Sequence, residues 1–141
     1  MENGNKKTSS DKQVVIRDFK DLLAWQFART LRMKIYEVSS RFPKAETFAL
    51  SSQIRRAAIS VSANIAEGYG RFSYQENIRY CRQSPGSIYE LRDHLTCALD
   101  AGYITQAEYQ ETETLALSVT KLINGYIRST RLKGDNTEVS Q

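Results

Sequence analysis

Two glutamates, Glu67 and Glu90, come closest to the residues of a catalytic site in this 141-residue sequence. A pair of carboxylates can serve as general acid and general base. No nucleophile or set of metal ligands accompanies them, and His94 is the only histidine, which leaves nothing for a catalytic triad or a histidine metal site. We therefore expect no enzymatic activity, no catalytic residue, no metal and no cofactor.

Glu67 has a simpler structural explanation. It lies near the end of a predicted helix, where a carboxylate is unfavourable by about a few tenths of a kcal/mol unless a cation pairs with it. Arg71 or Arg56 could be that cation. Together with Asn64 and Gly68, these residues are predicted to order the end of the helix or to contact a second subunit.

A second group consists of Gly86, Ser87 and Glu90. Small residues within a helix let a neighbouring helix come close, so Gly86→Leu is expected to force two helices apart. Glu90 would then reach Arg55 or Arg56, in an ion pair that fixes helix register more than it adds stability. The residues expected to face this group are Ala58, Ser62 and Ala66.

The third group is basic. Its members could contact phosphates without selecting bases, because nothing in the sequence resembles a recognition helix, an aromatic platform for RNA or a phosphate-binding loop. The alternative is a solvated face, helped at the end of the last helix by the helix dipole. The predicted nucleic-acid-binding residues are Lys20, Arg29, Arg32, Lys34, Arg41, Arg55, Arg71, Lys121, Arg128 and Arg131.

The distribution of charge is uneven along the sequence. Residues 1–71 hold 13 basic and 7 acidic side chains, a net of +6, whereas residues 72–141 hold 7 and 9, a net of −2. A local positive field favours a polyanionic partner such as RNA or DNA. The total of +4 is nevertheless also ordinary for a soluble domain, so charge alone leaves both interpretations open.

Helices must position all of these groups. A chain of this length fits one domain, and two prolines and seven glycines leave long stretches without a helix breaker. Apolar residues recur at three- and four-residue steps in four such stretches. This pattern predicts an all-α protein, an antiparallel up-down-up-down four-helix bundle over residues 17–133. Residues 1–16 and 134–141 are predicted to be flexible tails.

The first two helices have the clearest apolar faces. We expect the first to begin after Asp18, as its N-cap, and to end at Pro43. The second spans residues 50–67, and Gly68 closes it in the left-handed cap conformation. The predicted seams are Ala24, Ala28, Leu31, Ile35, Val38 and Phe42 in the first helix and Ile54, Ala57, Ala58, Val61 and Ile65 in the second. The residues expected to plug the end of the core are Phe48 and Leu50.

The third and fourth helices each begin with a predicted capping box and end at a glycine. The boxes are Ser73 with Glu76 and Thr105 with Glu108, and the glycines are Gly102 and Gly134. Pro85 interrupts the third helix, because proline cannot donate to the carbonyl of Cys81 and, with Gly86, costs about a few kcal/mol. Since the apolar rows keep their phase on both sides, we expect a kinked but continuous helix.

The two cysteines, Cys81 and Cys97, lie 16 residues apart in this third helix. At 1.5 Å per residue they are separated by about 24 Å, well beyond the limit of about 7 Å for a disulfide. Isolated thiols, the lack of a signal peptide and the lack of an apolar run long enough to span a bilayer predict a cytoplasmic protein without a membrane partner.

Several words of the sequence resemble a known bacterial family. They are ANIAEG at 63–68, QIRRA at 53–57, GSIYEL at 86–91, DLLAWQFA at 21–28 and FPKAETFAL at 42–50. Together they resemble the four-helix-bundle proteins encoded by intervening sequences of large-subunit ribosomal RNA genes, some of which are described as ribosomal proteins. The same family includes the accessory variability determinant of diversity-generating retroelements. The resemblance extends from about Phe19 to Arg131.

The resemblance implies a ring-shaped homopentamer of antiparallel bundles. For the retroelement members it also implies a basic outer surface that works with a reverse transcriptase and RNA. This chain departs from the family at Ser84 and Pro85, where relatives usually have a helix-forming pair such as Ala-Arg. Two hypotheses follow: a non-enzymatic bundle that binds RNA, DNA or a nucleoprotein, and a protein scaffold, for a reverse transcriptase or a ribosomal component, without nucleic-acid contact.

Overall fold

The computed structural model describes residues 15–139, with side chains described as far as Asn136. Residues 1–14 and 140–141, which belong to the two predicted tails, lie outside this range. The described chain forms five α-helices and two short 3-10 turns. These are η1 Phe19–Asp21, α1 Leu23–Ser39, η2 Lys44–Glu46, α2 Leu50–Tyr69, α3 Tyr74–Cys81, α4 Gln83–Asp100 and α5 Gln106–Val139.

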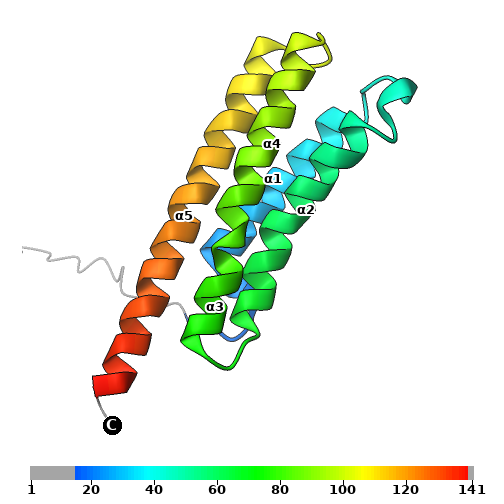
Figure 1. The fold of residues 1–141 in the computed structure, drawn as a ribbon. Coiled ribbons are helices and arrows are strands. Elements are labelled where there is room, and N and C mark those ends of the chain that lie inside the picture. Colours follow the sequence, from blue (N-terminus) through cyan, green and yellow to red (C-terminus); the bar gives the residue numbers. More distant parts are fainter. Residues whose placement is uncertain (1–14, 140–141) are drawn as a thin grey trace, which may run out of the picture.

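The helices form the predicted antiparallel up-down-up-down four-helix bundle, in which α3 and α4 follow each other along one rod (Figure 1). α1 packs against α2 and α5, α2 packs against α3 and α4, and both α3 and α4 also pack against α5. The described part of the chain contains no strand. The start of α1, the end of α2, α3 and the second half of α5 therefore meet at one end of the bundle.

The predicted apolar seams form the core. Every residue of the seams assigned to the first two helices is buried, from Ala24 to Phe42 in and after α1 and from Ile54 to Ile65 in α2. The side of the core that faces these two helices is formed by residues of α4 and α5, namely Ile88, Leu91, Leu95, Ala116, Val119 and Ile123. Burying one such side chain contributes about 1.5–3 kcal/mol, so the shared seam is the main force holding the four rods together.

The first helix starts later than predicted. Asp18 precedes the turn η1, and α1 begins only at Leu23. The carboxylate of Asp21, and not that of Asp18, accepts hydrogen bonds from the backbone N–H groups of Arg17 and Asp18, both at 3.0 Å. The prediction of Asp18 as the N-cap of the first helix was therefore wrong, because a tight turn stands between this residue and the helix.

Phe48 does not plug the core. Its side chain is 94% exposed, whereas Leu50 is half-buried against the core, as predicted. The rings of Phe42 and Tyr103 close this end instead, with centroids 5.5 Å apart. Tyr103 donates its hydroxyl to Glu46 at 3.1 Å, which ties the loop after α1 to the turn after α4.

Gly68 does not end the second helix. α2 continues to Tyr69, and Gly102 is the one glycine with a positive φ in the described residues, at 77°. Gly68 is buried, and a Cβ atom there would lie 2.7 Å from the backbone carbonyl oxygen of Asn77. Glycine is therefore present because α3 passes close to the backbone of α2, and the predicted left-handed cap is wrong.

The interruption of the third rod falls at Arg82, between α3 and α4. Arg82 keeps helical dihedral angles, φ −65° and ψ −17°, so α3 and α4 follow each other along one rod. They are nevertheless two helices, and the predicted continuous third helix is wrong. Gly86 is exposed, with nothing within 4 Å of a Cβ atom built on it. The close approach to α2 is made instead by buried Ser84, whose hydroxyl donates to the carbonyl of Val61 at 3.0 Å. The prediction that Gly86 spaces these helices was wrong.

The predicted caps of the last two helices are largely confirmed. The Ser73 hydroxyl accepts from the backbone N–H of Glu76 at 3.1 Å. Thr105 and Glu108 exchange backbone-to-side-chain hydrogen bonds at 3.0 and 3.1 Å. Gly134, however, does not end the last helix, because α5 runs on to Val139, and Gly134 packs against the ring of Tyr74.

Candidate nucleic-acid interface

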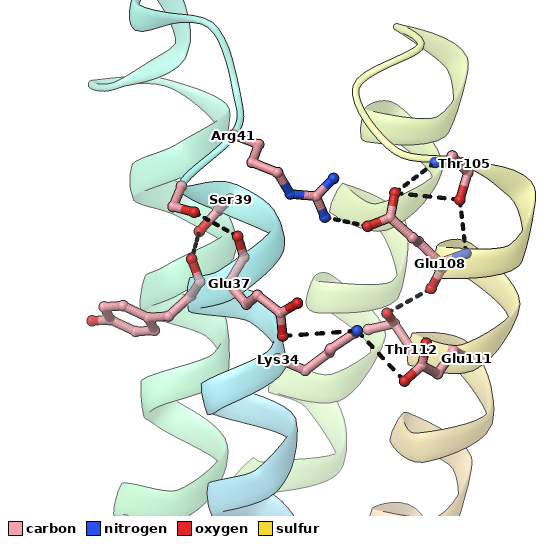
Figure 2. Close-up of polar contacts among 10 residues, drawn as sticks. Lys34, Glu37, Ser39, Arg41, Thr105, Glu108, Glu111 and Thr112 are labelled. Carbon is pink, nitrogen blue, oxygen red and sulfur yellow. Dashed lines mark hydrogen bonds and ion pairs between the residues drawn. The ribbon is translucent and has the colours of Figure 1, made fainter.

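Two of the predicted phosphate-binding residues are paired with carboxylates of α5. Lys34 lies 3.4 Å from Glu111 and 3.8 Å from Glu37, and Arg41 forms an ion pair with Glu108 (Figure 2). These contacts join side chains of α1 and the turn after it to the first turns of α5. The local positive charge predicted for this part of the chain is therefore neutralised by acids that follow it by some 70 residues.

Glu108 is the centre of this cluster. The hydrogen bond from Arg41 and the backbone N–H of Thr105 lower the pKa of the Glu108 carboxyl from its ordinary value near 4.5 to about 2. The same pairing raises the pKa of Arg41. Glu108 is therefore a carboxylate over the whole ordinary pH range. Its negative charge pairs with Arg41 and so joins α5 to the turn after α1.

Two more of the predicted residues make contacts inside the bundle. Arg32 donates to the hydroxyl of Ser62 at 2.8 Å, which joins α1 to α2. Arg55 donates to Ser39 at 2.7 Å and lies over the ring of Tyr36, 4.8 Å from its centroid. These arginines hold α1 and α2 in register, so a phosphate would have to compete with those contacts.

The group near the end of α2 is a set of short-range contacts. Glu67 pairs with Arg71 at 2.8 Å, as one of the predicted alternatives stated. Arg71 also donates to the hydroxyl of Tyr80 at 2.7 Å. Asn64 donates to the carbonyl of Ser60 at 2.9 Å. The hydrogen bond from Arg71 to Tyr80 joins the loop after α2 to α3, and the other contacts lie within α2 and this loop, so the group has a structural role.

The residues predicted to act together around Gly86 do not share one contact in the structure. Ser87 does face α2, with its hydroxyl 2.9 Å from that of Ser60. Glu90 instead lies 3.3 Å from His94, on its own helix, and Arg56 is exposed. The expected pair between Glu90 and an arginine of α2 is not formed, because Arg55 turns toward α1.

The remaining predicted residues lie near the start of α1 and between the middle and the end of α5. Lys20 and Arg29 are exposed and lie over the rings of Phe19 and Trp25, at 5.8 and 6.0 Å from the centroids. The last three, Lys121, Arg128 and Arg131, are exposed on α5. No ion pair or hydrogen bond joins these three side chains to another residue in the described range.

The structure thus concentrates positive charge at one end of the bundle. We name as the basic end residues 17–29, 67–82 and 121–136, which hold ten basic and five acidic side chains, a net of +5. The other residues between 15 and 136 hold seven basic and eight acidic side chains, a net of −1. Arg79 of α3 and Arg82, which follows α3, belong to the basic end. Both were missed in the sequence, because only the antiparallel packing brings α3 beside α5.

A cavity opens at the basic end. Its volume is about 670 Å³, and it lies between the start of α1, the loop after α2 and the second half of α5. Leu22, Leu122, Tyr126 and Lys121 form part of its wall. The sequence carried no sign of it, since its wall combines residues more than 100 positions apart.

Two kinds of site are missing from residues 15–139. They contain no cluster of three or more histidine, cysteine, aspartate or glutamate side chains able to hold a metal ion. None of the helices in that range combines the length and the apolar character needed to cross a membrane.

Comparison with known proteins agrees with this architecture. The chain is similar over 74% of its length to 98% of a crystallised protein of unknown function from the S23 ribosomal protein family of Bacteroides thetaiotaomicron, with a TM-score of 0.69 and 21% identity. At that identity the similarity concerns the fold alone. No curated protein matches the chain.

The sequence itself matches a family pattern. Residues 20–125 fit the family described as 23S rRNA-intervening sequence protein. The match ends before Arg128 and Arg131, so part of the basic end lies beyond the family pattern. Because the match covers well over half of the chain, the protein belongs to the 23S rRNA-intervening sequence protein family.

Proposed function

We propose that this protein is a non-enzymatic, oligomeric helical bundle of the cytoplasm that binds RNA through the phosphates at its basic end. The observation that carries the proposal is the net charge of +5 in that region, against −1 for the other residues between 15 and 136. Lys121, Arg128 and Arg131 supply three exposed cations on one stretch of helix. Such a field attracts a polyanion and raises the rate of its association.

Binding of this kind selects structure and charge more than sequence. Lysine and arginine side chains on an exposed helix reach phosphate oxygens, which carry no base information. The family is named after an intervening sequence in 23S rRNA, and this makes RNA the first nucleic acid to test. DNA of the same length is the natural comparison, because a phosphate contact alone does not distinguish the two.

A salt titration tests the proposal. Filter binding of a structured RNA should be detectable at low salt, and the logarithm of the affinity should fall linearly with the logarithm of the salt concentration. The slope gives the number of phosphates that the protein neutralises. An affinity that does not change with salt, or no binding at low salt, would refute the proposal.

A protein scaffold is the second candidate, and the exposed apolar residues of α1 favour it. Met33 and Tyr36, with Ile59 of α2, are between 42% and 59% exposed and form a shallow groove with Arg32. Leu23 and Phe27 continue the apolar surface toward the start of α1. A self-association surface, and the homopentamer that the family resemblance implies, would use this face, as would a reverse transcriptase or a ribosomal component.

The two candidates can be separated. Light scattering gives the oligomeric state directly. Pull-down experiments after nuclease treatment distinguish the partners, because a protein-only contact survives the nuclease while an RNA-mediated one does not. Assembly and RNA binding are also compatible, since five copies of the basic end would multiply the avidity for one RNA.

A further inference from the structure

The cavity at the basic end has the size of a ligand site. Its volume of about 670 Å³ lies within the range of roughly 300–1,000 Å³ that is usual for pockets that bind small ligands. The inner wall is apolar, with Leu22 almost fully buried. On the floor, the amide of Asn77 donates to the hydroxyl of Tyr126 at 2.8 Å, which holds that ring in place. The cavity is therefore preformed by packed side chains.

Aromatic residues stand at its rim. Phe72, in the loop between α2 and α3, is fully exposed, and its neighbour Tyr74 is 42% exposed. Both line the cavity. A phenyl ring left entirely in water gives up the stabilisation of about 1.5–3 kcal/mol that its burial would provide. Both faces of this ring are open to a planar partner.

The charge of the cavity wall is positive. Arg71, Lys121 and Lys133 line it, and no aspartate or glutamate does. Glu67, which pairs with Arg71, is not part of the wall. An occupant that carries negative charge and a flat ring would thus meet complementary groups, the cations of the wall for its charge and the aromatic residues for its ring.

We propose that this cavity receives an unpaired nucleotide of a single-stranded nucleic acid, whose base stacks on Phe72 while its phosphates lie beside Lys121. The proposal rests on the proposed function and adds a preference for single strands. Stacking of bases on aromatic side chains beside a cationic path is how proteins hold single strands without sequence selection. In a duplex the bases are already stacked and cannot reach the ring.

Fluorescence anisotropy with a short labelled RNA, as a single strand and as a duplex, tests this. Phe72→Ala should weaken the binding of the single strand about tenfold or more, the effect usual for losing one stacked base, and change duplex binding less than twofold. Phe72→Trp should restore single-strand binding. Lys121→Gln should weaken both, because both present phosphates.

Phe48→Ala is the matched control, since Phe48 is also an almost fully exposed loop phenylalanine but lies away from the cavity. It should leave both affinities unchanged. Equal losses for the single strand and the duplex in Phe72→Ala, or no loss, would overturn the stacking proposal while leaving phosphate binding intact. A change of oligomeric state in Phe72→Ala would also overturn it, by showing that the rim contacts a second copy. Failure of the unmodified protein to bind any RNA would instead remove the proposed function.

Discussion

A methyl group on Gly68 would lie 2.7 Å from the backbone carbonyl oxygen of Asn77. Real Cβ atoms essentially never come so close to another atom, and a backbone carbonyl cannot turn aside as a side chain can. The same methyl group would lie 3.0 Å from the sulfur of Cys81. α2 and α3 are thus in contact through their backbones at this point.

We predict that Gly68→Ala lowers the free energy of unfolding by about 1–3 kcal/mol, because the added carbon must push α3 away from α2. Urea denaturation followed by circular dichroism measures the change. The gain of helix propensity from glycine to alanine, at most about 1 kcal/mol, is included in this net figure.

Gly86→Ala, in α4, is the matched control. A Cβ atom there has nothing within 4 Å, so the substitution should stabilise the protein by about 0.5–1 kcal/mol through helix propensity alone. A destabilisation of the same size as in Gly68→Ala would contradict the assignment of the close contact to Gly68.

The ion pair between Arg41 and Glu108 predicts a dependence of stability on pH. The pKa of Glu108 is about 2 in the folded protein and near 4.5 ordinarily, so folding favours its charged form. This contribution is complete above about pH 4.5 and is lost as the pH falls toward 2. Thermal unfolding over this range should therefore show a shallower fall of Tm in Glu108→Gln than in the unmodified protein. Glutamine still offers an oxygen to the backbone N–H of Thr105 and removes only the charge.

Arg41→Gln supplies the second half of a double-mutant cycle. If the ion pair with Arg41 causes the low pKa of Glu108, Arg41→Gln alone should make the fall of Tm at low pH shallower. The double variant should then show little further change. Fully additive effects of the two substitutions would show that Glu108 owes its stabilisation to the helix start alone.

The basic end predicts unequal effects of charge removal on RNA binding. Lys121→Gln and Arg128→Gln should each lower the slope of log affinity against log salt by about 1, because each removes one phosphate contact. Lys34→Gln and Arg41→Gln should change the slope much less, since carboxylates of α5 already neutralise these cations. Equal effects of all four variants would mean that binding follows total charge and not the basic end.

The two cysteines should differ in reactivity. Cys81 is fully buried, and burial raises the pKa of its thiol to about 11, whereas Cys97 is exposed. Because the thiolate is the reactive form, a maleimide at neutral pH should modify Cys97 and leave Cys81 intact until the protein unfolds. Mass spectrometry of the folded and the denatured protein measures this. In Cys97→Ser, rapid labelling of the folded protein would contradict the packing around Cys81.

The sequence predicted the elements well because their signals are local. The seam from Ala24 to Val38 repeats with the period of a helix, and Ser73 and Thr105 cap helices through contacts only three residues long. Where the prediction failed, the deciding contact was distant. Gly68 was predicted to end its helix, but a glycine is needed there because the backbone of Asn77 in α3 leaves no room for a side chain. Phe48 looked like a core residue, but the loop directs it outward.

The sequence by itself determined four amphipathic helices and hence an all-α bundle, because a repeat of apolar residues along one helix face must be buried. Only the tertiary structure decided where the charge lies. Along the sequence the first half is the basic one, yet in the folded protein Lys34 and Arg41 meet Glu111 and Glu108 of α5. The cations of α5 are left at the other end, with the cavity and Phe72. The physical reason is that an ion pair between helices depends on how each helix is rotated and docked against the others, which no local pattern specifies.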